Sequence, residues 1–169
     1  MGEVEVGTPP FAIARCVKLP GFGEPVTTEL HSFSDAIDVG LGQVTYLRHV
    51  NNLNQVHVSF PMGKARVVAF KPMSSPRREL TAAVISVNVS SMLNRELKYE
   101  DPVQVIYTDS SVVLSYIRNE AKRFHTYDEN PEHHIRESSE PKQWHYVARM
   151  INPADVASQR HTSEATFST

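Results

Sequence analysis

Hydrophobic and polar positions alternate in three consecutive segments of the first part of the chain. The segments are residues 30–34, 43–48 and 55–60. Strict alternation over a short segment is typical of a half-buried β-strand. A polar turn signal at residues 51–54 separates the second segment from the third. Short connections of this kind predict an antiparallel meander of three strands.

After the third segment, the spacing of the apolar residues changes to that of a helix. Residues 65–70 either extend the third strand or lead into this helix. Ser75 is its expected N-cap and Pro76 its first residue. Apolar residues follow on two stripes, Leu80–Val84–Val87 and Ala82–Ile85–Val89. A helix that is apolar on two stripes is expected to be well buried.

The rest of the chain predicts a strand, a helix, a strand and a last helix. Residues 103–108 form the first of these strands, and Ser110 or Ser111 caps the helix that follows it. Residues 120–142 show no readable pattern, and residues 143–147 predict another strand. Asn152 caps the last helix, with Pro153 as its first residue. This order predicts an α/β fold, with an irregular lead-in over residues 1–28, one domain over residues 29–160 and a tail over residues 161–169.

Composition narrows the class of protein. The chain has 169 residues, of which 40% are hydrophobic and 21% charged, as expected for a soluble domain with a core. No apolar run reaches membrane-spanning length, and the first residues do not form a signal peptide. The single cysteine, Cys16, cannot form an internal disulfide, which indicates a reducing, intracellular compartment, either the cytoplasm or the nucleus.

Four acidic residues stand at the ends of the predicted elements. They are Asp35, Glu79, Asp109 and Asp155. A carboxylate buried within an element is costly, whereas carboxylates at element ends can converge on a metal ion. Two Mg²⁺ ions held in this way support phosphodiester hydrolysis. The alternative is that these residues are ordinary helix caps and surface acids.

The net charge of this chain does not by itself favour binding to nucleic acid. The 17 basic residues are outnumbered by 19 acidic ones, which gives a net charge of -2. Most nucleic-acid binders are basic overall, so a local basic patch or bound metal ions must offset the acidic residues. The candidate phosphate contacts are Arg77, Arg78, Lys122 and Arg123. Each of them alone is equally compatible with a solvated surface charge.

Several motifs, in the same order along the chain, resemble the ribonuclease H region of BEL/Pao-type LTR retrotransposon polyproteins. They include Leu-His-Ser-Phe-Ser-Asp at residues 30–35, Glu-Leu-Thr-Ala-Ala at 79–83, Thr-Asp-Ser at 108–110 and Asn-Pro-Ala-Asp at 152–155. The resemblance covers roughly residues 12–160. This chain differs from the family at Arg78, where a leucine is usual, at Tyr107, where a tryptophan is usual, and over residues 128–132, which are acidic rather than basic.

The resemblance implies an RNase H-like mixed sheet, flanked by helices, whose first three strands are antiparallel. It also implies that Asp35, Glu79, Asp109 and Asp155 are the catalytic residues and metal ligands, with two Mg²⁺ or Mn²⁺ ions as cofactors. The implied activity is cleavage of the RNA strand of an RNA–DNA hybrid. The implied partners are this hybrid and the reverse transcriptase and integrase regions of the same polyprotein, with no membrane partner.

Two other functions remain open from the sequence. The chain is alternatively a catalytically inactive RNase H-like fragment that binds nucleic acid and needs the rest of the polyprotein. A DNA-strand-transfer enzyme of the same fold superfamily is a third interpretation, because fold alone does not fix function. The local motifs, however, do not resemble those of integrases.

Overall fold

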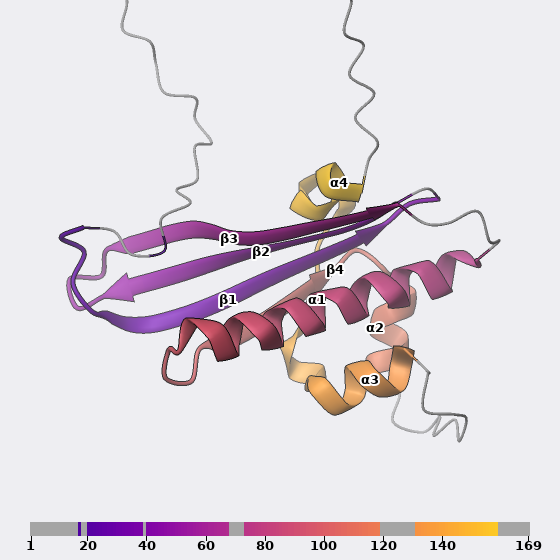
Figure 1. Ribbon diagram of the computed structural model, residues 1–169. Helices are drawn as coiled ribbons and strands as arrows, with labels where there is room; N and C mark the ends of the chain where they lie inside the picture. The colour runs from indigo at the N-terminus through magenta and orange to yellow at the C-terminus, as the bar shows by residue number, and fades with distance from the viewer. Residues whose placement is uncertain (1–16, 18–19, 39, 68–72, 119–130, 159–169) are drawn as a thin grey trace, which may run out of the picture.

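Five strands form one mixed sheet in this computed structural model (Figure 1), which describes residues 17, 20–38, 40–67, 73–118 and 131–158. Strands β1, β2 and β3 pair antiparallel, β4 runs parallel to β1, and β5 runs parallel to β4. The strand order across the sheet is β3-β2-β1-β4-β5. The strands are β1 (Pro25–Ala36), β2 (Gly40–Asn51), β3 (Val56–Val67), β4 (Val103–Thr108) and β5 (Trp144–Tyr146).

Helices cover the two faces of the sheet unequally. One face carries α1 (Ser75–Leu97), α2 (Ser111–Arg118) and α3 (Pro131–Ser138), whereas the short α4 (Pro153–Ser158) lies on the other face (Figure 1). Two 3-10 turns, η1 (Pro141–Gln143) and η2 (Arg149–Ile151), flank β5. The long α1 crosses the sheet, and its buried residues follow both apolar stripes of its sequence.

The hydrophobic core consists of two clusters along α1. The first joins α1, α2, α3, β4 and β5, with Ile106, Ile135 and Trp144 among its most buried members. The second packs Leu30 and Leu47 of the sheet against the carboxyl-terminal half of α1. Burial of these side chains fixes the position of α1 on the sheet. The core therefore also fixes the place at which the first turns of α1 begin.

Two glycines in β2 allow α4 to approach the sheet closely. A Cβ atom at Gly40 would lie 2.4 Å from the carbonyl oxygen of Ser158. A Cβ atom at Gly42 would lie 2.4 Å from the carbonyl oxygen of Ala154. Because both neighbouring atoms belong to the backbone, a side chain at either position would displace α4.

The structure confirms the predicted mixed sheet with three antiparallel strands, and β4 has the predicted bounds. Several boundaries differ from the predicted ones. Residues 25–28 belong to β1 rather than to an irregular lead-in, because they pair with β2. The helix α1 begins at Ser75, with Ser74 as N-cap. The stretch without a readable pattern contains α3 and η1. The third strand extends to Val67, whereas residues 68–70 lie outside the described part of the chain.

Candidate active site

Asp35 and Asp109 lie side by side because of the strand pairing. In the parallel β1–β4 pair, Ser34 is opposite Thr108, and the two aspartates are the next residues along the chain. Neighbouring strands in a sheet are about 4.8 Å apart, so the two residues leave the same edge of the sheet as direct neighbours. Asp35 is 5% exposed. This pairing is the geometric centre of the candidate site.

Glu79 reaches the same edge from the first turns of α1. The hydroxyl of Ser110, the residue after Asp109, donates a hydrogen bond to the Glu79 carboxylate. The same Ser110 oxygen accepts a hydrogen bond from the backbone N–H of Val113 at 3.2 Å, so it caps α2 as predicted. Ser110 therefore links the end of β4, the start of α2 and the Glu79 side chain.

The short helix α4 is tied to the end of β1 by two hydrogen bonds. The side-chain amide of Asn152 donates to the backbone carbonyl of Ser34 at 2.9 Å. The Asn152 side-chain oxygen accepts from the backbone N–H of Ala154 at 3.1 Å, which confirms Asn152 as the cap of α4. The hydroxyl of Ser158 donates to the Asp35 carboxylate. These contacts bring the first turn of α4, with Asp155, to the edge of the sheet that holds Asp35.

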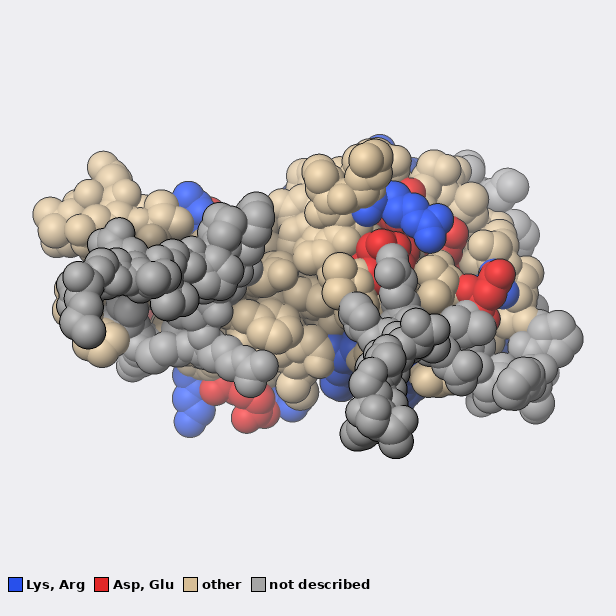
Figure 2. All heavy atoms as spheres, turned by 90° about the horizontal axis from the view of Figure 1, so that it is seen from above, with Lys and Arg blue, Asp and Glu red and all other residues tan. Residues whose placement is uncertain are grey.

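The charges at this edge influence one another. Burial, together with the Asp35 and Glu79 carboxylates, raises the pKa of Asp109 to about 6, while Arg149 opposes this change. The Arg149 Nε lies 3.6 Å from Asp155 Oδ1. In Figure 2, acidic and basic side chains gather next to each other near one end of the face that carries α4. Asp35, Glu79 and Asp109 therefore influence one another, and Arg149 lies between this group and Asp155.

The donor chemistry of this environment fits a divalent cation. Carboxylate oxygens are the preferred protein ligands of Mg²⁺, which retains several of its waters. Within the described ranges, no three His, Cys, Asp or Glu side chains are arranged closely enough to hold one metal ion. The carboxylates have the chemistry that Mg²⁺ prefers, but the described residues do not form an assembled metal site in this structure.

The predicted phosphate contacts have different surroundings. Arg77 is exposed on the first turn of α1. Arg78 is mostly buried, and its guanidinium contacts Asp38 Oδ1 at 2.5 Å and the carbonyl oxygen of Met73 at 2.6 Å. Lys122 and Arg123 lie outside the described residues. Arg77 is thus the candidate with an accessible guanidinium.

Sequence reasoning missed three polar residues of this edge. Ser158 and Arg149 had no predicted role, and Ser110 was predicted only as a cap. The Asn152-Pro153 pair predicts the start of α4. Nothing local in the sequence shows that Ser158, at the end of this helix, contacts Asp35. The separation along the chain explains this, because each of these contacts joins segments that only the folded sheet brings together.

Comparison with known families identifies the chain. The profile of the family described as the Pao retrotransposon-like RNaseH-like domain matches residues 5–110, which is more than half of the sequence. The chain belongs to this family. In this RNaseH-like domain, the matched region contains Asp35, Glu79 and Asp109 and ends before Asp155. None of the curated proteins compared with the domain matches it.

Solved structures of ribonucleases H resemble the domain in fold. LC11-RNase H1, solved in complex with an RNA/DNA hybrid, has a TM-score of 0.50 and 11% identity, over 78% of this chain and 94% of that one. RNase H1 from Halobacterium salinarum NRC-1 has a TM-score of 0.45 and 12% identity, with the same coverage of both chains. The RNase H domain of rv2228c from Mycobacterium tuberculosis, solved as a fusion with maltose-binding protein, has a TM-score of 0.47 and 10% identity, over 79% and 91%.

The match to LC11-RNase H1 agrees with the observed fold. Its mixed five-stranded sheet flanked by helices is RNase H-like, as the sequence motifs implied. Among the described helices, none is both long and apolar enough to span a membrane.

Proposed function

We propose that this domain cleaves the RNA strand of RNA–DNA hybrids by hydrolysis that depends on two divalent cations, Mg²⁺ or Mn²⁺. The observation that carries the proposal is the pairing of β1 with β4. It places Asp35 directly beside Asp109 at one edge of the sheet. Glu79 and Asp155 are brought to the same edge by α1 and α4.

The residues at this edge would act as ligands and as supports. Asp35, Glu79 and Asp109 would hold the cations through their carboxylate oxygens, with Asp155 completing the set. The cations, when bound, supply an activated water and neutralise the leaving oxygen. The hydroxyls of Ser110 and Ser158 orient Glu79 and Asp35 by donating hydrogen bonds to them. Such supporting bonds preorganise carboxylates that would otherwise repel one another.

The proposed substrate is a hybrid duplex that is recognised by its shape. An A-form-like duplex displays 2′-hydroxyls in a wide minor groove, where a protein can distinguish RNA without reading its sequence. The exposed Arg77 stands two residues before Glu79, which suits a contact with the phosphate backbone. The fold of LC11-RNase H1, which was solved with a hybrid, supports this choice of substrate. Cleavage should therefore tolerate many base sequences.

The substrate class is tested with three labelled duplexes of the same sequence and one hybrid of unrelated sequence. We expect the domain to cleave the RNA strand of the hybrid in Mg²⁺ and to stop when the metal is chelated. Duplex DNA, duplex RNA and a hybrid of unrelated sequence serve as comparisons. Equal cleavage of duplex DNA, or strict dependence on one base sequence, would contradict the proposal.

A second candidate function is hybrid binding without cleavage, in a domain that requires the reverse transcriptase and integrase regions of its polyprotein for activity. The observation in its favour is Arg149, whose guanidinium already lies beside Asp155 and within the field of Asp109. A protein cation at this place partly fulfils the role of a metal. Retention of the hybrid in a filter-binding assay, with no cleavage in either Mg²⁺ or Mn²⁺, would favour this function.

A further inference from the structure

The 3-10 turn η2 is held between the ends of β4 and β1. The backbone N–H of Val147, before the turn, donates to the carbonyl oxygen of Thr108 at 3.0 Å. The side-chain amide of Asn152, after the turn, donates to the carbonyl oxygen of Ser34 at 2.9 Å. Thr108 and Ser34 immediately precede the two paired aspartates of the candidate active site. Because β1 and β4 are neighbouring strands, about 4.8 Å apart, the turn spans the strand ends that carry these aspartates.

The apolar side chains of this turn are exposed. Met150 is 98% exposed and Ile151 is 73% exposed. The turn is closed by its own backbone, through the Ile151 N–H to the Ala148 oxygen at 3.0 Å and the Asn152 N–H to the Arg149 oxygen at 3.1 Å. Turns are usually built from Gly, Pro, Asn, Asp and Ser. Two exposed apolar side chains in a row, on a loop fixed at both ends, therefore favour contact with a partner.

Arg149 places a positive charge at the start of the same turn. Its Nε lies 3.6 Å from Asp155 Oδ1, and its side chain is 67% exposed. Its charge also acts on Asp109, whose pKa it lowers against the effect of burial. An exposed ion pair at this distance is weak, so the guanidinium is available to a stronger partner. A phosphate is such a partner, because it accepts two parallel hydrogen bonds from a guanidinium.

The position of the turn indicates which partner it contacts. A phosphodiester cleaved at Asp35 and Asp109 must lie at these strand ends, so the adjoining backbone of its strand passes over η2. An arginine next to exposed Met and Ile side chains is a combination that minor-groove binders use. In an A-form-like duplex the wide, shallow minor groove makes the sugars accessible to such side chains.

We propose that η2 is a second contact to the hybrid duplex, in which Arg149 binds a phosphate next to the cleaved one and Met150 and Ile151 lie against sugars of the minor groove. This inference rests on the proposed hybrid substrate. It adds a contact from the connection between β5 and α4 to the one proposed for Arg77 of α1. Because all of these contacts are to phosphates and sugars, they hold for any base sequence.

The test is the binding of a fluorescent hybrid to the whole chain, measured by anisotropy in Ca²⁺ over a range of salt concentrations. Ca²⁺ takes oxygen ligands but lacks the strict octahedral geometry of Mg²⁺. Arg149→Gln should weaken binding about tenfold and reduce the slope of log K against log salt by about 1, because one phosphate contact is lost. The double variant Met150→Ser with Ile151→Ser should weaken binding about tenfold without changing this slope, because only apolar contact is lost.

Two matched controls make the same chemical changes far from the carboxylates. Arg95→Gln removes an exposed, ion-paired arginine from the last turn of α1. Leu53→Ser removes an apolar side chain that is 71% exposed, in the turn after the end of β2 remote from Asp35. Both controls should bind the hybrid as the wild type does. The melting temperatures of all four variants should match that of the wild type, because the substituted side chains are exposed.

The outcomes separate this inference from the proposed function. Hybrid binding by the wild type that is unchanged in affinity and salt slope in both η2 variants would overturn the inference alone, and would assign the exposed turn to another partner, such as a protein surface. Equal weakening by the two controls would also overturn it. A wild-type chain that binds no hybrid would overturn the inference and the proposed function together.

Discussion

At the scale of single residues, the surroundings of Asp109 destabilise its negatively charged form. Its pKa is raised to about 6 by burial and by the carboxylates of Asp35 and Glu79. The folded protein therefore binds a proton at this residue between pH 3.8 and about 6, where the unfolded chain has already lost it. The free energy of unfolding must then decrease as the pH rises through this window.

The first prediction concerns Asp109→Asn in metal-free protein. Asparagine keeps the shape and removes the charge, so the variant should be more stable than the wild type by roughly 1–3 kcal/mol at pH 7. The difference should shrink toward zero as the pH falls below the window. Denaturant unfolding of both proteins from pH 4 to 8 measures it. A stability difference that does not change with pH would contradict this explanation.

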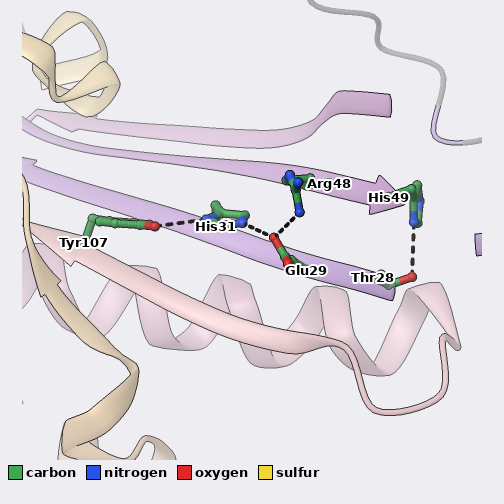
Figure 3. Close-up of polar contacts among 6 residues, drawn as sticks. All are labelled: Thr28, Glu29, His31, Arg48, His49 and Tyr107. Atoms are coloured by element: carbon green, nitrogen blue, oxygen red, sulfur yellow. Dashed lines mark hydrogen bonds and ion pairs between the residues drawn. The ribbon is translucent and has the colours of Figure 1, made fainter. Parts of the chain in front are cut away.

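Glu29 shows the opposite behaviour on the open face of the sheet (Figure 3). Burial alone would raise its pKa, but hydrogen bonds from His31 at 2.9 Å and Arg48 at 3.0 Å outweigh it, so the pKa is lowered from 4.5. The His31 Nδ1 is in turn 3.1 Å from the hydroxyl of Tyr107, which stacks on Phe33. The charged form of Glu29 therefore stabilises the fold above pH 4.5, and this contribution is lost as the pH falls through the lower folded pKa.

The second prediction follows from this network. Glu29→Gln should lower the free energy of unfolding at pH 7 by roughly 0.5–1.5 kcal/mol, a range reduced for its partial exposure. The loss should disappear in acid, where the wild-type carboxylate is also neutral. Glu96→Gln is the matched control, because Glu96 is 63% exposed and pairs only with its neighbour Arg95 among the described contacts. A control with an equally large, pH-dependent loss would show that the effect is not specific to the network.

At the scale of elements, α4, which carries Asp155, is bound to the end of β1. It has only six residues, so its position depends on the sheet rather than on its own helical stability. The glycines of β2 provide the space, and the bonds from Asn152 and Ser158 fix the orientation.

The third prediction is that Gly42→Ala displaces α4. The added Cβ would be 2.4 Å from the Ala154 carbonyl oxygen and 2.6 Å from the Ser158 nitrogen, and neither backbone atom can rotate away. We expect a loss of roughly 1–3 kcal/mol in stability together with a larger loss of cleavage. The control is Gly63→Ala, whose nearest contact at 2.9 Å is the movable end of the Phe60 side chain. Equal effects of the two substitutions on cleavage would argue against a role for α4.

The elements also show what the sequence can predict. The bounds of β4 were predictable because Pro102 precedes its apolar run and the Thr-Asp-Ser motif follows it. The start of α4 was also predictable, because Asn152 is a good N-cap and Pro153 suits the first helical position. The helix α3 could not be predicted. Among its residues with described side chains, Ile135 is the buried hydrophobic one, and a single apolar position does not establish a helical period. The extension of β1 to Pro25 was hidden by polar residues that pair with β2.

At the scale of the whole molecule, the proposed nuclease site joins the ends of β1 and β4 with α1 on one face of the sheet and α4 on the other. Three of the four carboxylates, Asp35, Glu79 and Asp109, lie in the region that matches the family, whereas Asp155 lies beyond it. The positions of the four residues could be predicted from motifs and element ends. Their exact arrangement could not, because it depends on the β1–β4 pairing, which makes Asp35 and Asp109 direct neighbours, while no three of the described acidic residues are close enough to hold one ion.

The measurement that tests the central claim most directly is single-turnover cleavage of a labelled hybrid by wild type, Asp109→Asn and Asp101→Asn. Asp101 lies just before β4, at its other end, so the control makes the same chemical change on the same strand. We predict Mg²⁺-dependent cleavage by wild type and Asp101→Asn. For Asp109→Asn we predict a loss of at least about a hundredfold with an intact fold. Full activity of Asp109→Asn would contradict the account, and so would the absence of Mg²⁺-dependent cleavage in the wild type.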